Sequence, residues 1–274
     1  MAYPSIAIQS LSEADKCIII MGVTGAGKST FVAHAAGRFS SDDDGLIGHE
    51  LLSCTSEIYA TRIQNRPNGD NVVLVDTPGF DDTETPDVMI LKKIADWLAA
   101  TGKQGIKLAG VIYLHRISDN RLNNAKMVNL KMLKSMCGAD AMPNVALVST
   151  MWSCAGSKFL SRETELRSTF WKDMITNGAA YRRFEDSTQS AWDIITPLLA
   201  LETVELSFQQ EISNGCSVPE TQAGRSARQS PSRMTSLGQP TSESTTLAYA
   251  QVKSQIASYV SGFDSWTTSN KWND

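Results

Sequence analysis

Residues 17–31 read CIIIMGVTGAGKSTF, and this stretch decides the fold. An apolar run meets a glycine-rich loop that matches GxxxxGK[ST], with the fixed positions at Gly22, Gly27, Lys28 and Ser29. The run is too short for a helix core and suits a strand covered on both faces, as in a parallel sheet. Glycines let successive backbone N–H groups converge on phosphate oxygens at a helix N-terminus. The stretch therefore predicts a buried strand, a phosphate-binding loop and a helix.

The residue types in this loop predict individual roles. Lys28 is expected to reach the β- and γ-phosphates of a nucleotide, and therefore to act in catalysis as well as in binding. The Ser29 hydroxyl is expected to bind Mg²⁺. The predicted nucleotide contacts of the loop are Gly22, Thr24, Gly25, Ala26, Gly27, Lys28, Ser29 and Thr30.

A second motif decides between the classes of phosphate-loop protein. The apolar run 71–76, NVVLVD, ends in the DxxG pattern Asp76-Thr77-Pro78-Gly79. An Asp at a strand end can hold Mg²⁺ through water, and the N–H of Gly79 can contact a γ-phosphate. This motif favours a G domain over a kinase or a transport ATPase.

A G domain also needs a hydroxyl that completes the Mg²⁺ shell when the γ-phosphate is present. In the loop ELLSCTSEIY, Thr55 directly precedes a predicted edge strand and is our choice of ligand. Ser53 and Ser56 remain alternatives, as does a loop that gives no ligand at all.

Composition limits the possible partners and the cellular compartment of the protein. The 274 residues carry a formal net charge of −4, which argues against nucleic acid as the main partner. Five scattered cysteines suit a reducing compartment. The N-terminus lacks the pattern of a signal peptide, and no apolar run is long enough to span a membrane. We expect a cytoplasmic protein.

Strands alternate with helices from residue 16 to about 213, which predicts an α/β fold: a P-loop NTPase G domain whose mainly parallel sheet has helices on both faces. A helical region is expected from about 190 to 213; the alternative is a start near Thr196, because proline belongs in a first helical turn. The other expected segments are an N-terminal extension at 1–15, a disordered Ser/Thr/Pro-rich linker at 217–246, a short helix at 247–261 and a tail at 262–274.

Four segments together resemble the septin-related GTPases, which include the immunity-associated and chloroplast-import-receptor GTPases. The resemblance is closer still to the G-domain-containing proteins of filamentous fungi. The segments are GVTGAGKSTF (22–31), SCTSEI (53–58), LVDTPGFDDT (74–83) and GVIYLHRISDNR (110–121). The resemblance implies a nucleotide-switched domain that binds GTP or GDP with Mg²⁺ and forms a homodimer through its nucleotide face.

The guanine-recognition motif [NT]KxD is altered in this chain. Its positions hold Thr150, Met151, Trp152 and Ser153, so the carboxylate that accepts guanine N–H groups is missing. Thr150 and Trp152 remain candidate base contacts. By resemblance, Glu185 and Asp186 form a second base loop; the alternatives are a backbone contact at Ser190-Ala191, or a solvated turn.

The position after DxxG often holds a Gln that orients the attacking water, and here it holds Phe80. Unaided hydrolysis should therefore be slow. Arg116 and Arg121 follow a buried strand, where one of them could supply transition-state charge across a dimer. The alternative is that they form structural salt bridges. The leading interpretation is a GTP-binding switch with slow hydrolysis; the alternative is a scaffold that binds GTP without significant turnover.

Overall fold

A computed structural model describes residues 7–37, 57–63, 71–81, 85–119, 124–154 and 158–228. Residues 1–232 form one compact unit, and a second unit at 233–274 lies outside the described residues. Within the described ranges, no helix is long and apolar enough to cross a membrane.

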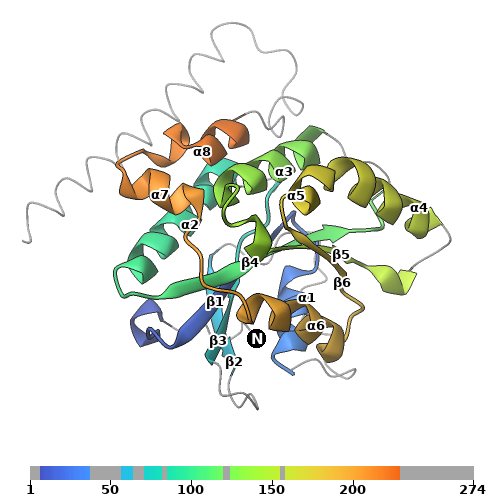
Figure 1. The fold of residues 1–274 in the computed structure, drawn as a ribbon, viewed down its shortest axis with the longest axis horizontal. Coiled ribbons are helices and arrows are strands. Elements are labelled where there is room, and N and C mark those ends of the chain that lie inside the picture. Colours follow the sequence, from blue (N-terminus) through green and yellow to red (C-terminus); the bar gives the residue numbers. More distant parts are fainter. Residues whose placement is uncertain are drawn as a thin grey trace, which may run out of the picture. The chain divides into compact units, whose positions relative to one another are not determined.

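The described residues form a six-stranded sheet of order β2-β3-β1-β4-β5-β6 (Figure 1). All neighbouring strands are parallel except the edge strand β2, which pairs antiparallel with β3. The strands are β1 (Asp15–Gly22), β2 (Tyr59–Ile63), β3 (Asn71–Asp76), β4 (Lys107–Arg116), β5 (Val145–Thr150) and β6 (Ala180–Arg183). The predicted mainly parallel sheet and its edge strand are confirmed.

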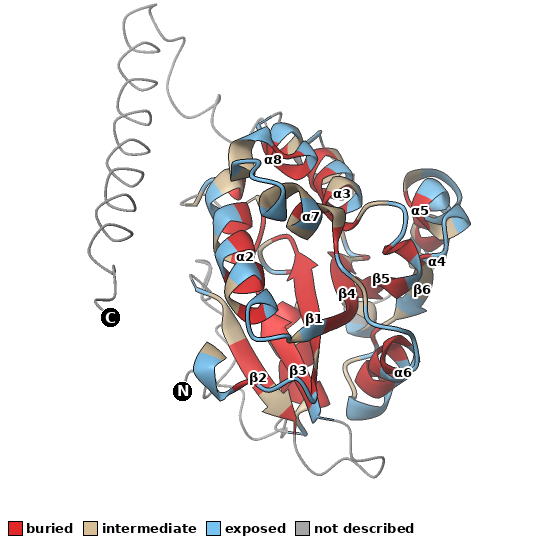
Figure 2. Ribbon diagram, turned by 60° about the vertical axis from the view of Figure 1, so that its left-hand side comes forward, coloured by how far each residue is buried: buried red, intermediate tan, exposed pale blue. Residues whose placement is uncertain are grey.

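Helices cover both faces of the sheet, as predicted. On β1, Ile18 and Ile20 pack with α1 and α6, whereas Cys17, Ile19 and Met21 pack with α2 and α3 on the opposite face. Burial on both faces explains why the strand is apolar without alternation, and Figure 2 shows the buried strands at the centre. The helices are α1 (Lys28–Ala35), α2 (Asp87–Gly102), α3 (Asn124–Cys137), α4 (Lys158–Glu165), α5 (Lys172–Thr176), α6 (Thr188–Leu199), α7 (Ser207–Ser213) and α8 (Gln222–Ala227). A π-helical turn, Leu166–Phe170, joins α4 to α5.

The alternative helix start near Thr196 is wrong, whereas the predicted start near residue 190 is close to the observed one. Helix α6 begins at Thr188 and contains Pro197 in its last turns. The Ser187 hydroxyl accepts a hydrogen bond from the N–H of Ser190 at 3.1 Å and so caps the helix at the earlier position.

The predicted disordered linker begins too early. Residues 217–228 form a 3₁₀ turn, Val218–Glu220, and then helix α8, which packs on α3. Ala223 and Ala227 are buried there, and the Thr221 hydroxyl caps α8 through the N–H of Gly224 at 3.0 Å. The small residues of α8 allow it to pack closely on α3. Because small residues are also typical of disordered linkers, this segment was predicted to be a linker. The predictions for 229–246, 247–261 and 262–274 fall outside the described residues, as do residues 1–6 of the extension 1–15.

Candidate nucleotide-binding site

The carboxyl ends of the four central parallel strands lie at one edge of the sheet, where folds of this class place their ligand sites. The loop 22–27 follows β1 there and leads directly into α1. The strand ends beside it carry Asp76 on β3, Arg116 on β4 and Thr150 on β5. The structure therefore gathers the predicted phosphate, metal and base residues at one edge.

Two glycines permit the close packing of this edge. Gly22 has φ of +147°, and a Cβ there would lie 2.4 Å from the carbonyl oxygen of Leu114 on β4. A Cβ on Gly79 would lie 2.4 Å from Oγ1 of Thr24. The DxxG loop is thus in direct contact with the phosphate loop.

Backbone hydrogen bonds join these two loops. The N–H of Thr24 donates to the carbonyl of Phe80 at 3.0 Å, and the N–H of Phe80 donates to the carbonyl of Gly22 at 3.2 Å. The Thr77 hydroxyl also donates to the carbonyl of Ile20 at 2.8 Å. A displacement of the DxxG loop would therefore be transmitted to the phosphate loop.

The side chains of Lys28, Ser29 and Asp76 lie together. Nζ of Lys28 donates to the carbonyls of Gly22 and Val23 at 3.1 and 3.2 Å, and Oγ of Ser29 donates to Oδ2 of Asp76 at 2.7 Å. Burial raises the pKa of Asp76, while the Lys28 charge and the Ser29 hydrogen bond oppose that rise. Oδ1 of Asp76 is buried without a hydrogen-bond partner among the described residues.

These groups fit Mg²⁺. A buried carboxylate oxygen and a hydroxyl are hard oxygen donors, and Mg²⁺ is typically held by one or two carboxylates together with water and substrate phosphates. The described ranges contain no group of three or more His, Cys, Asp or Glu residues that could hold a metal ion. Thr55, with its alternatives Ser53 and Ser56, lies outside the described residues.

Arg116 lies beside the phosphate loop. A Cβ on Gly25 would be 3.0 Å from Nη1 of Arg116, so the guanidinium covers this part of the loop. Its Nε is also 3.2 Å from Oδ1 of Asp119, which pairs with Lys126 through Oδ2 at 2.7 Å. Asp119 is therefore the partner that the alternative role of Arg116, a structural salt bridge, requires. Arg121 lies outside the described residues.

The loop after β5 is tied to the phosphate loop by Thr150. Its hydroxyl donates to the carbonyl of Ala26 at 2.9 Å. Met151 has a left-handed backbone with φ of +65°, and its Cε is 3.7 Å from where a Cβ on Gly27 would lie. The apolar side chain of Met151 therefore lies over the loop, at the position of the missing lysine.

The structure brings the two predicted base loops together. Burial raises the pKa of Asp186, while the nearby His34 and the Ser153 side chain oppose that rise, so Ser153 lies next to this carboxylate. Glu185 beside it is exposed. Trp152 is turned toward β5, where its Nε1 donates to the carbonyl and hydroxyl oxygens of Ser149 at 3.2 and 3.0 Å.

Residues 17–137 match the family model described as 50S ribosome-binding GTPase. The structure is similar to Toc33 from Arabidopsis thaliana in complex with Mg²⁺ and GMPPNP, with 15% identity and a TM-score of 0.50 over 74% of this chain and 86% of that one. It is also similar to a structure titled for the importance of dimerization to the GTPase activity of the chloroplast translocon components atToc33 and psToc159. That match has 12% identity and a TM-score of 0.51, over 70% of this chain and 87% of that one. No curated protein sequence gives a significant match. The fold is that of a P-loop GTPase G domain.

Several features of this G domain were not predicted from the sequence. Phe80 follows DxxG, and its side chain is fully buried in the core. The contact between Ser153 and Asp186 was not foreseen. Neither was the role of Glu163 and Arg183, which pack beneath the loop after β5 and carry no sequence signal of their own.

Proposed function

We propose that this chain is a GTP-binding molecular switch with slow intrinsic hydrolysis, accelerated by self-association or by a partner. The single observation that carries the proposal is the Ser29–Asp76 hydrogen bond beside Lys28, with a buried carboxylate oxygen that lacks a partner among the described residues. Such a set is suited to a Mg²⁺-bound triphosphate. The motifs further suggest that the chain is related to the septin-like and fungal G-domain proteins.

Two contacts support recognition of guanine. Asp186 carries a carboxylate next to Ser153, at the position where the usual aspartate is missing, and could accept the guanine N–H groups in its place. Thr150 holds its loop against the phosphate loop, with Trp152 and Glu185 as further candidate contacts. We expect a preference for GTP over ATP that is weaker than in G domains with the usual aspartate.

The switch itself would run through the DxxG loop. A γ-phosphate contact at the N–H of Gly79 would be passed to the phosphate loop by the Thr24–Phe80 and Phe80–Gly22 hydrogen bonds. The buried ring of Phe80 offers no hydrogen bond to an attacking water, so the transition state needs charge from elsewhere. Arg116 and Arg121 are the candidate sources, in this protomer or in a second copy. The dimerization described for atToc33 and psToc159 makes a homodimer through the nucleotide face a reasonable form for this chain.

The same buried ring also favours the second candidate function, a scaffold that binds GTP without turnover. Measuring single-turnover GTP hydrolysis over a range of protein concentrations separates the two. A first-order rate constant that rises with concentration supports the switch, and absence of product at every concentration supports the scaffold. Failure to bind Mg²⁺-GTP would reject both.

A further inference from the structure

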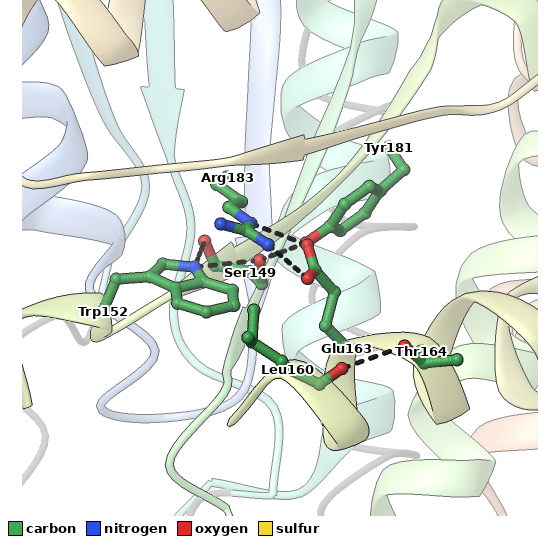
Figure 3. A network of polar contacts seen from close by, with 7 residues as sticks. All are labelled: Ser149, Trp152, Leu160, Glu163, Thr164, Tyr181 and Arg183. Carbon is green, nitrogen blue, oxygen red and sulfur yellow. Dashed lines mark hydrogen bonds and ion pairs between the residues drawn. The ribbon is translucent and has the colours of Figure 1, made fainter. Parts of the chain in front are cut away.

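A partly buried polar network lies beneath the loop that follows β5 (Figure 3). It brings together Ser149 from β5, Tyr181 and Arg183 from β6, Glu163 from α4 and Trp152 from the loop itself. None of these residues carries a phosphate or metal motif. The network therefore calls for an explanation apart from the phosphate site.

Glu163 and Arg183 form the rigid centre of this network. Nε of Arg183 donates to Oε1 of Glu163 at 2.6 Å, and Nη2 donates to Oε2, so the pair is bidentate. The Tyr181 hydroxyl donates to Oε1 as well and is 2.8 Å from the Ser149 hydroxyl. Two parallel hydrogen bonds between planar groups fix the orientation of the guanidinium.

The fixed guanidinium in turn holds Trp152. Cζ of Arg183 lies 4.3 Å from the centre of the indole ring, and Phe159 meets the ring edge-on at 6.4 Å. The indole Nε1 donates to both oxygens of Ser149. Trp152 is therefore held by a cation over its ring, by an aromatic neighbour and by hydrogen bonds at its polar atom.

Trp152 stands between the two altered residues of the base motif. Met151 before it has the left-handed φ of +65°, which a non-glycine residue keeps only when its surroundings impose it. Ser153 after it lies next to Asp186, whose pKa it helps to lower. The backbone on both sides of Trp152 thus depends on where the indole is anchored.

We infer that the Glu163–Arg183–Trp152 network is a specificity-determining device that positions Met151 and Ser153 for the nucleotide base. The inference rests on the proposed function. Glu163 and Arg183 are positioning residues that act through Trp152, so their loss should weaken recognition of the base and spare that of the phosphates. In this chain the network would orient the loop that usually carries the lysine and aspartate of the base motif.

The test compares Arg183→Met, made in the whole 274-residue chain, with the matched control Arg182→Met, whose arginine is exposed on the same strand. For each protein, the dissociation constants of GTP, ATP and inorganic tripolyphosphate are measured with Mg²⁺. We expect Arg183→Met to bind GTP about tenfold more weakly, with a GTP:ATP ratio near one and unchanged tripolyphosphate affinity. The control should match the wild type in all three. Trp152→Leu should give the same loss, and the double variant no further loss.

Several results would overturn the inference. One is an unchanged GTP:ATP ratio in folded Arg183→Met; another is a parallel loss of tripolyphosphate affinity, which indicates general damage. Should that variant fail to fold, Glu163→Gln, which keeps the side-chain shape, decides by the same three affinities. A wild-type protein that binds tripolyphosphate with no preference for GTP rejects this inference alone, whereas one that binds no triphosphate rejects the proposed function.

Discussion

The hydroxyl of Ser29 donates to Oδ2 of Asp76 over 2.7 Å and thereby joins the first turn of α1 to the end of β3. The other carboxylate oxygen of Asp76 is buried and has no hydrogen-bond partner among the described residues. A buried carboxylate in this condition lowers stability in the absence of a cation, because desolvation is only partly compensated. The arrangement thus favours ligand binding at some expense of stability.

Asp76→Asn should separate these two effects. Removing the charge should leave the melting temperature without Mg²⁺ equal to or above that of the wild type, while Mg²⁺ no longer strengthens GTP binding by about tenfold or more. Thermal unfolding and nucleotide titrations with and without Mg²⁺ measure the two quantities. Asp193→Asn, at an exposed position on α6, is the control. An Asn variant with full Mg²⁺ dependence would remove Asp76 from the metal site.

Gly79→Ala tests the contact between the DxxG and phosphate loops. The added Cβ would lie 2.6 Å from both the N and Cα atoms of Thr24, so a backbone must move. We expect about 1–3 kcal/mol of destabilisation together with weaker GTP binding. Thr24→Gly should not rescue the variant, because the clashing backbone atoms remain. Gly102→Ala is the control, since a Cβ there meets nothing within 4 Å. Rescue by Thr24→Gly would show that only the side chain is in conflict.

Truncation tests the part that α8 plays in the domain. A chain that ends at Ser217 lacks Ala223 and Ala227, which are buried where α8 packs on α3. We expect it to lose about 2 kcal/mol relative to a chain that ends at Ser232, or about 4–8 °C in melting temperature. Equal melting temperatures in the two truncated chains would mean that α8 adds nothing to the core.

The lowered pKa of the buried His115 should make the stability of the fold depend on pH. Burial lowers the pKa of His115 from 6.5 to about 4, with Lys126 and Arg116 acting in the same direction and Asp119 opposing them. Between these values the unfolded chain binds a proton that the folded chain does not, so stability falls as pH falls from 6.5 toward 4. His115→Phe, which keeps an aromatic ring against Trp171, should flatten this decline in denaturant unfolding at pH 7, 6 and 5. His34 acts in the same direction, so some decline should remain. Equal slopes in variant and wild type would contradict the assignment.

The sheet and the loop between β1 and α1 could be predicted because their signals are local. An apolar run beside GxxxxGK[ST], and a second run ending in DTPG, define strand, loop and helix within a few residues of one another. The base site is different: Ser153 and Asp186 meet only because β5 and β6 pair in the folded sheet. The direction of the Phe80 ring could not be predicted from the sequence either. The DxxG motif specifies the loop backbone, but core packing decides where the following side chain points.

The burial of Phe80 gives a prediction about hydrolysis. If the missing glutamine alone made hydrolysis slow, Phe80→Gln would accelerate it. Because the ring is fully buried, the amide would instead replace core packing, and we expect about 3 kcal/mol of destabilisation without faster turnover. A stable Phe80→Gln protein with rapid hydrolysis would show that this side chain can reach the nucleotide. Chemical denaturation and single-turnover assays provide the two measurements.

Positive charge at the γ-phosphate must still be supplied, and Arg116 and Arg121 are the candidate sources. Arg116 is already paired with Asp119 beside Gly25, so moving it to a second protomer would break that pair. We therefore expect Arg116→Ala to lower hydrolysis by the dilute protein and its accelerated form alike. Arg121→Ala should keep GTP affinity and lose only the acceleration, since an inserted arginine contributes about a thousandfold or more in rate. Dilute wild-type protein should turn over more slowly than about one GTP in ten minutes. Single-turnover rates across protein concentrations decide: fast hydrolysis at every dilution, or full acceleration in Arg121→Ala, would refute this division of roles.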